Sequence, residues 1–151
     1  MEKRFATELA FLVTAAAPRA ERAARIAEVI RSGGQFHWVG LYEVAEESIR
    51  AIAWTGTGPP ADPSFPRHRG LNGAAVRSGA MVVVNDVASD PRYLTTFAST
   101  GAEMVVPVLD ELGSVVGTVD VESPHVGAFG AAEQQLVGEA ARLIAALWCA
   151  K

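Results

Sequence analysis

The most informative part of this 151-residue sequence is FHWVGLYEV, residues 36–44, which three residues separate from SIRAIAW, residues 48–54. Aliphatic and other side chains alternate along these segments, which is the period of a β-strand. The intervening AEE forms a short acidic turn, so the two segments predict an antiparallel hairpin. Residues 102–109 and 114–121 predict a second hairpin, about residues 110–113. Two hairpins favour an α/β fold of the α+β kind, with a central antiparallel sheet and helices packed on one face.

Helical patterns lie on both sides of the hairpins in the sequence. Residues 3–32 are rich in good helix formers, and Pro18 divides them into two helices. We expect Pro18 to open the second helix and Gly33-Gly34 to end it. A final helix is predicted from Phe129 to Trp148. The expected apolar stripes are Ala23, Ile26, Ala27 and Ile30 in the second helix, and Phe129, Ala132, Leu136, Ala140, Leu143 and Leu147 in the final one.

Two long irregular stretches interrupt these elements. Residues 56–70 are rich in proline and glycine and are predicted to be a loop, and residues 85–100 are a second one, with a helical turn expected after Pro91. Between the two we expect a short helix at residues 71–78 and a buried strand at residues 81–84. Connections of this length are unusual in a compact domain, so both are candidates for a lid over a binding site.

Composition and charge exclude several classes of protein. Half of the residues are apolar and the formal net charge is −4, which argues against a nucleic-acid-binding surface. There is no apolar run long enough to span a membrane, and Lys3, Arg4 and Glu8 interrupt what would be the apolar centre of a signal peptide. We therefore expect a cytoplasmic protein. No repeat or linker is visible, which predicts a single domain over residues 1–151, with a helical segment at 1–33 and a core at 34–149.

The alternation assigns side chains to the two faces of the sheet. Trp38, Gly40 and Tyr42 share one face, opposite Val39 and Leu41. In the same way Thr118, Asp120 and Glu122 share a face, and Glu103 can join them from the preceding strand. The aliphatic faces belong against the helices, which leaves the long loops to cover the aromatic and acidic groups.

Carboxylates under a lid attract an ammonium group, and the faces of tryptophan and tyrosine add cation–π contact. The candidate ligand-binding residues are therefore Trp38, Tyr42, Glu103, Asp120 and Glu122. The alternative is that Asp120 and Glu122 lie on a solvated sheet face and that Trp38 and Tyr42 are ordinary packing.

The remaining chemistry-bearing residues form no recognisable site. Cys149 is the single cysteine, so the chain can form neither an internal disulfide nor a CxxC pair, and we expect a partly buried thiol at a helix end, with Lys151 as the only cation within a turn. His37, His68 and His125 lack the spacing of a helical zinc site. Walker, GxGxxG and GxSxG motifs are absent. We therefore expect no metal, no cofactor and no catalytic residue.

From Trp38 to about Trp148 the chain resembles a GAF domain. The segments that carry the resemblance are WVGLY at 38–42, GLNG at 70–73, NDV at 85–87 with DPR at 90–92, EMVVPV at 103–108 and GTVDVESP at 117–124. Their order and spacing carry it, rather than any one of them. The resemblance implies a GAF/PAS-like fold with a ligand pocket under loops on the face of the sheet away from the helices, and, through the helices, a homodimer.

Within that superfamily the chain is most similar to the free methionine-(R)-sulfoxide reductases. The resemblance implies that this family's pocket groups correspond to Trp38, Tyr42, Glu103, Asp120 and Glu122, the residues that the alternation also selects. The family reduces its substrate with cysteine thiols, but Asn72 and Thr96 stand at two of the thiol positions and Asp62 stands near the third. An amide, an alcohol and a carboxylate cannot replace a thiolate in attack on a sulfoxide, so that reaction is not expected here.

Other GAF activities also lack their residues. Asn85, Phe97 and Glu103 match fragments of the N-K-x-F-D-E signature of cyclic-nucleotide binders, but Asp86 replaces the lysine and the spacing differs. Bilin attachment lacks a pocket cysteine, and a haem would have only His68 as a conceivable ligand.

Three hypotheses follow. The first is a non-catalytic sensory module that binds an amino acid or another ammonium-bearing metabolite, with residues 57–70 and 88–100 closing over it. The second is a structural module that dimerises through its helices and keeps a vestigial pocket. The third is an enzyme that uses the carboxylates as acid or base, or unrecognised reductase-like chemistry.

Overall fold

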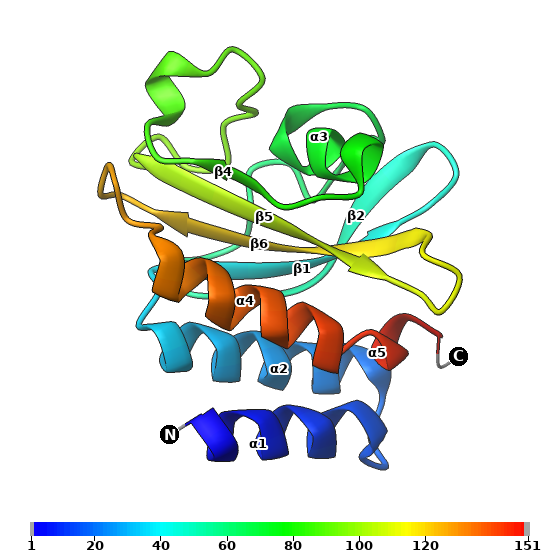
Figure 1. The fold of residues 1–151 in the computed structure, drawn as a ribbon. Helices are drawn as coiled ribbons and strands as arrows, with labels where there is room; N and C mark the ends of the chain where they lie inside the picture. The colour runs from blue at the N-terminus through cyan, green and yellow to red at the C-terminus, as the bar shows by residue number, and fades with distance from the viewer. Residues whose placement is uncertain (1, 150–151) are drawn as a thin grey trace.

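The computed structural model describes residues 2–149 as a six-stranded antiparallel sheet with helices on both faces (Figure 1). The strand order is β3-β2-β1-β6-β5-β4. Every neighbouring pair is antiparallel, and the two predicted hairpins form β1–β2 and β5–β6. The strands are β1 (Trp38–Val44), β2 (Ser48–Thr55), β3 (Ser64–Pro66), β4 (Val82–Val84), β5 (Ala102–Leu109) and β6 (Val115–Ser123). The α/β fold with a central antiparallel sheet is confirmed.

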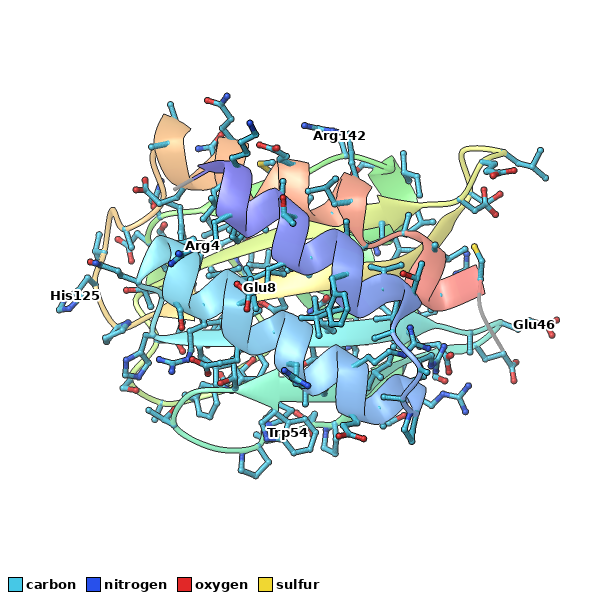
Figure 2. All side chains as sticks on the ribbon, turned by 90° about the horizontal axis from the view of Figure 1, so that it is seen from below. Arg4, Glu8, Glu46, Trp54, His125 and Arg142 are labelled. Carbon is cyan, nitrogen blue, oxygen red and sulfur yellow. The ribbon has the colours of Figure 1, made fainter. Side chains whose placement is uncertain are left out.

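Most of the helical mass covers one face of the sheet. Helices α2 and α4 pack directly on the strands, and α1 packs on α2 and α4 as an outer layer (Figure 1). Figure 2, seen from this helical side, shows the helices laid across the sheet. The short helix α3 lies on the opposite face with the long loops, against β5 and β6. The helices are α1 (Glu2–Thr14), α2 (Arg19–Gly34), α3 (Gly70–Ser78), the 3-10 turn η1 (Val87–Ser89), α4 (Ala131–Leu143) and α5 (Ala146–Cys149).

The main hydrophobic core fills the space between the sheet and the helical layer. Val39, Leu41, Val119 and Val121 point into it and are fully buried, as the alternation predicts. The predicted stripe of α2 is confirmed, since Ala23, Ile26, Ala27 and Ile30 are all buried there. The predicted stripe of the final helix is wrong at Ala132, which is exposed, while Val137, Ala140 and Ile144 are buried.

The end of α2 differs from the prediction. Pro18 caps its start, but Gly33 and Gly34 lie inside the helix, and the left-handed residue that ends it is Gln35, with φ 55°. The glycines are needed for packing: a Cβ on Gly33 would lie 2.8 Å from the Phe5 ring, and one on Gly34 would overlap the ring of Phe36. Both phenylalanines are buried, so core packing, and not helix termination, explains the glycine pair.

Two predictions for the irregular stretches need correction. Residues 56–70 are not wholly loop, because β3 pairs there with β2 and extends the sheet by one strand. The helical turn of the second stretch is η1, which precedes Pro91. It forms where Asp86 accepts a hydrogen bond from the Ala88 N–H at 3.3 Å, a local cap that determines the position of the turn.

The final helix is also not continuous. It ends at Leu143, with Ile144 as its C-cap, and resumes as the four-residue α5, in which Leu147 and Trp148 turn toward the core. Cys149 is therefore exposed and not partly buried, while Lys151 lies outside the described residues. Within residues 2–149 no helix has both the length and the apolar character needed to cross a membrane.

Candidate functional site

Three adjacent strands bring the predicted residues to the face of the sheet opposite the helical layer. In the pairing of β1 with β6, Trp38, Gly40 and Tyr42 stand beside Glu122, Asp120 and Thr118 respectively. In the pairing of β5 with β6, Glu103 stands beside Glu122. Residues on neighbouring strands at paired positions share a face, so the register itself gathers two aromatic rings and three carboxyl groups.

The aromatic part of the site depends on Gly40. A Cβ at that position would overlap the Trp38 ring and would lie 3.0 Å from the Tyr42 ring, so the missing side chain leaves room for both rings. Phe97 packs edge-on against Trp38 at 5.4 Å between ring centroids, and Phe65 does the same to Tyr42 at 5.8 Å. The Trp38 indole N–H donates to the carbonyl of Gly58 at 2.8 Å. Both long loops thus contact this aromatic group.

The acidic part of the site is buried. Glu103, Asp120 and Glu122 are only 2%, 1% and 1% exposed. One carboxylate oxygen from each lies within 4.8 Å of those from the other two. The interpretation of Asp120 and Glu122 as groups on a solvated sheet face is therefore wrong. We call these three residues the acid cluster.

Several neutral side chains bind the acid cluster. The Asn72 amide donates to Asp120 Oδ2 at 3.0 Å and accepts from the Thr118 hydroxyl at 2.6 Å. The hydroxyls of Thr100 and Tyr93 donate to Glu122 Oε1 at 2.9 and 3.4 Å. Asp120 Oδ1 and Glu122 Oε2 are buried and have no hydrogen-bond partner among the described residues. An unpaired buried polar atom is costly, so these oxygens need either a proton shared with Glu103, which hydrogen-bonds both acids, or a cation.

Burial shifts the ionisation of every group in this site. It is the largest cause that raises the pKa of Glu122 to about 8, and the neighbouring Asp120 adds to it. Burial, followed by Asp120 and Glu122, raises the pKa of Glu103 well above its usual range. The pKa of Asp120 is also raised by burial, although hydrogen bonding to Glu103 and, to a smaller extent, to Asn72 opposes the shift. The same burial and the three acids raise the pKa of Tyr42, which therefore stays neutral. These raised pKa values favour the protonated forms of the three acids, and a positive charge beside them would favour the ionised forms.

A small cavity of about 10 Å³ lies beside the acid cluster, roughly the space of one water molecule. Its lining includes Tyr42 and Glu103, and also Asp62, Asn72 and Thr96. Asn72 and Thr96, at two of the positions at which the resembled reductases carry thiols, and Asp62, near the third, therefore line one cavity in this chain. None of the three side chains here is a thiol.

The other candidates from the sequence lie elsewhere. Cys149 is in α5, on the helical side of the sheet (Figure 1). His37, His68 and His125 are exposed. Within residues 2–149 the acid cluster is the only group of His, Cys, Asp or Glu side chains close enough together to hold a metal ion. Its carboxylate oxygens suit a hard divalent cation as well as an ammonium group.

Sequence reasoning misses five contributors to the site. Phe65, Tyr93, Phe97 and Thr100 come from the two irregular stretches, where no periodicity indicates which way a side chain points. Asn72 stands out in the sequence only as the replacement of a thiol, not as the partner of Asp120.

The comparisons with known proteins agree with this fold. A family model described as GAF domain matches residues 17–148, so the chain belongs to the GAF domain family. Protein ZMO0507 of Zymomonas mobilis is 31% identical over 97 residues, a match that covers 63% of this chain and 58% of that protein. The free methionine-R-sulfoxide reductase of Saccharomyces cerevisiae is 25% identical over 72% of this chain and 61% of its own length. The chain thus spans less than two thirds of these two curated relatives.

Solved structures give the same result. A type II free methionine-R-sulfoxide reductase from Thermoplasma acidophilum superposes with a TM-score of 0.81 at 27% identity, covering 86% of this chain and 92% of that one. The GAF domain of an Acinetobacter phosphoenolpyruvate-protein phosphotransferase superposes with a TM-score of 0.86 at 14% identity, over 99% and 93% of the two chains, which shows the fold alone. The chain is therefore a GAF domain, a small-molecule-binding regulatory fold, with structural and distant sequence similarity to free methionine-R-sulfoxide reductases.

Proposed function

We propose that this GAF domain is a non-catalytic sensory module whose pocket binds a small ammonium-bearing metabolite such as an amino acid. The observation that supports this proposal is the acid cluster, which has three buried carboxyl groups and two oxygens without a hydrogen-bond partner. No ion pair within residues 2–149 involves any of the three. A cation from outside the chain would supply the missing partner.

The upper limit on the spacing of the acid cluster is compatible with an ammonium group. Its N–H donors point tetrahedrally and bind carboxylate oxygens at about 2.8 Å, which places two such oxygens about 4.6 Å apart. The observed oxygens lie within 4.8 Å of one another. Trp38 and Tyr42, which flank the acid cluster, provide aromatic faces for the cation and for an apolar body attached to it.

Binding requires the loops to open. The cavity beside the acid cluster is about 10 Å³, far smaller than an amino acid. The loops over residues 57–70 and 88–100 cover it through Phe65, Phe97 and the Trp38–Gly58 hydrogen bond. In this proposal the loops admit the ligand and close on it, and their closure is the signal to whatever responds downstream.

Isothermal titration and thermal unfolding with free amino acids, both methionine sulfoxide epimers, small amines and cyclic nucleotides would test the proposal. A ligand at one hundred times its Kd adds about 2.7 kcal/mol to the free energy of unfolding. We expect an ammonium-bearing compound to bind, with Trp38→Ala and Asp120→Asn abolishing the effect. The matched control is Glu43→Gln. Glu43 is on the same strand as Trp38, but its carboxylate pairs with Arg19, so this variant should bind the ammonium compound normally.

Three results would contradict the proposal. Binding that survives both pocket substitutions would place the ligand elsewhere. Stabilisation by calcium or magnesium alone, without any effect of amines, would make the acid cluster a metal site. Consumption of methionine sulfoxide by the pure protein with a thiol reductant would make it an enzyme, although Asn72, Thr96 and Asp62 offer no thiol there.

A second candidate function is a dimerising structural module. Phe11 on α1 is 65% exposed on the outer helical layer, where a second copy could cover it. A homodimer is expected from the family resemblance, and light scattering at micromolar concentration would test it. A dimer whose stability no small molecule changes would favour this function over the sensory one. The cytoplasmic location is retained from the sequence as part of both proposals.

A further inference from the structure

A second pocket lies where the two covering loops meet on the outside. It has a volume of about 240 Å³ and is lined by His68, Arg69, Gly70, Arg77, Pro91, Arg92, Tyr93 and Leu94. The first loop and α3 contribute one wall, and the segment from Pro91 to Leu94 contributes the other. We call it the basic pocket.

Its charge is opposite to that of the protein as a whole. Three of its lining residues are arginines, one is a histidine, and none is acidic, whereas the chain has 13 basic and 17 acidic residues. Arg92 is neutralised by Asp90 at 2.7 Å. No carboxylate pairs with Arg69 or Arg77 in the part of the chain that the structure describes.

The backbone adds to this positive field. Arg69 is the N-cap of α3, its side chain makes no capping hydrogen bond, and the first turn of the helix contains no acidic residue. The positive end of the helix dipole is therefore not compensated locally. Arg77 is held over the pocket by the hydrogen bond that its guanidinium donates to the carbonyl of His68 at 2.6 Å.

We propose that the basic pocket binds a small oxyanion, a phosphate or carboxylate group, on Arg69 and Arg77. Guanidinium groups recognise such anions through paired hydrogen bonds, and the uncompensated helix terminus adds to the attraction. The anion could be free, or it could be one end of a larger ligand. The proposal requires no amine in the acid cluster.

The basic pocket adjoins the cavity beside the acid cluster, with shared residues between them. Gly70 and Leu94 line both the basic pocket and the cavity beside Glu103. Gly70 has φ 73°, and a Cβ there would lie 3.1 Å from the Leu94 Cβ, so these two residues form the partition between the sites. Tyr93 lines the basic pocket while its hydroxyl bonds Glu122. An oxyanion on Arg69 and Arg77 would join the end of the first loop to α3, on the wall that faces the segment from Pro91 to Leu94.

Titration of the full chain with inorganic phosphate, and separately with acetate, against chloride of matched ionic strength, would test this. Amide chemical shifts and calorimetry are the readouts. We expect saturable shifts confined to residues 68–70, 77 and 92–94. Arg69→Gln and Arg77→Gln should each weaken binding about ten-fold or more, as expected for loss of a charge-assisted bond. Both residues are exposed, so neither change threatens folding.

The matched control is Arg142→Gln, an exposed arginine on α4 on the helical side (Figure 2), which should bind phosphate normally. Asp120→Asn should also bind phosphate normally, which separates this proposal from the amine proposal. Shifts that do not saturate, that spread over the whole surface, or that Arg142→Gln weakens equally would overturn the basic pocket as a site. Loss of phosphate binding in Asp120→Asn would do so too.

Discussion

The two faces of the central strands β1 and β6 are both buried but differ in chemistry. Against the helices, β1 and β6 bury Val39, Leu41, Val119 and Val121. Against the loops, the alternate residues of the same strands bury Trp38, Tyr42, Asp120 and Glu122. The first face is an ordinary hydrophobic core, whose burial stabilises the fold. The second includes carboxyl groups whose burial is unfavourable unless a cation or proton joins them. Burial alone therefore does not identify a core, and the loop-covered face is the one organised for a ligand.

The largest effect is expected on the helical face. Leu41→Ala should lower the free energy of unfolding by about 2 to 5 kcal/mol, because it leaves a cavity in a fully buried region. Denaturant unfolding measures it. Leu112→Ala, at a residue that is 91% exposed, is the control and should change stability by less than about 0.5 kcal/mol. A Leu41→Ala protein as stable as the control would show that this face is not the stabilising one.

An effect that depends on pH, with an upper limit of about 4 kcal/mol over three pH units, is expected on the loop-covered face. The pKa of Glu122 is raised from 4.5 to about 8, so between these values the folded protein keeps a proton that the unfolded chain has lost. Stability should therefore fall as pH rises from 5 to 8, by at most about 1.4 kcal/mol per pH unit for this one group, and level off above that range.

Glu122→Gln should flatten that slope, as measured by denaturant unfolding at several pH values. Glu43→Gln should leave the slope in place, because hydrogen bonding to Arg19 lowers the pKa of Glu43. Stability that rises steadily from pH 5 to pH 8 would mean that the acid cluster is already compensated within the chain.

The smallest effects on stability are expected at the helix ends on the two sides of the sheet. Gln35 ends α2 with φ 55°, and Gly79 ends α3 with φ 65° and no atom near its missing Cβ. Gln35→Gly should stabilise the protein by about 1 kcal/mol, and Gly79→Ala should destabilise it by a similar amount. Thermal unfolding measures both. Equal signs for the two changes would contradict this account of the helix ends.

Much of the candidate site follows from alternation and resemblance. The period of two assigns Trp38 and Tyr42 to one face of β1 and Asp120 and Glu122 to one face of β6, and the pairing of the two strands brings these faces together. Alternation cannot show whether that face is wet or dry, because a polar sheet face in contact with solvent has the same pattern. Burial of Asp120 depends on α3 and the loops, whose contacts come from residues distant in the sequence.

The sequence by itself determined every strand except β3, most of the helix pattern and the division of side chains between two faces, because these depend on the local periods of about 3.6 and 2. Tertiary structure alone decided which glycines serve packing, since Gly33 and Gly34 are constrained by the rings of Phe5 and Phe36 and not by a helix end. It also decided the ionisation of the acid cluster. A pKa of about 8 for Glu122 arises from desolvation and a neighbouring charge, and both exist only once β1, β5, β6 and the covering loops have come together.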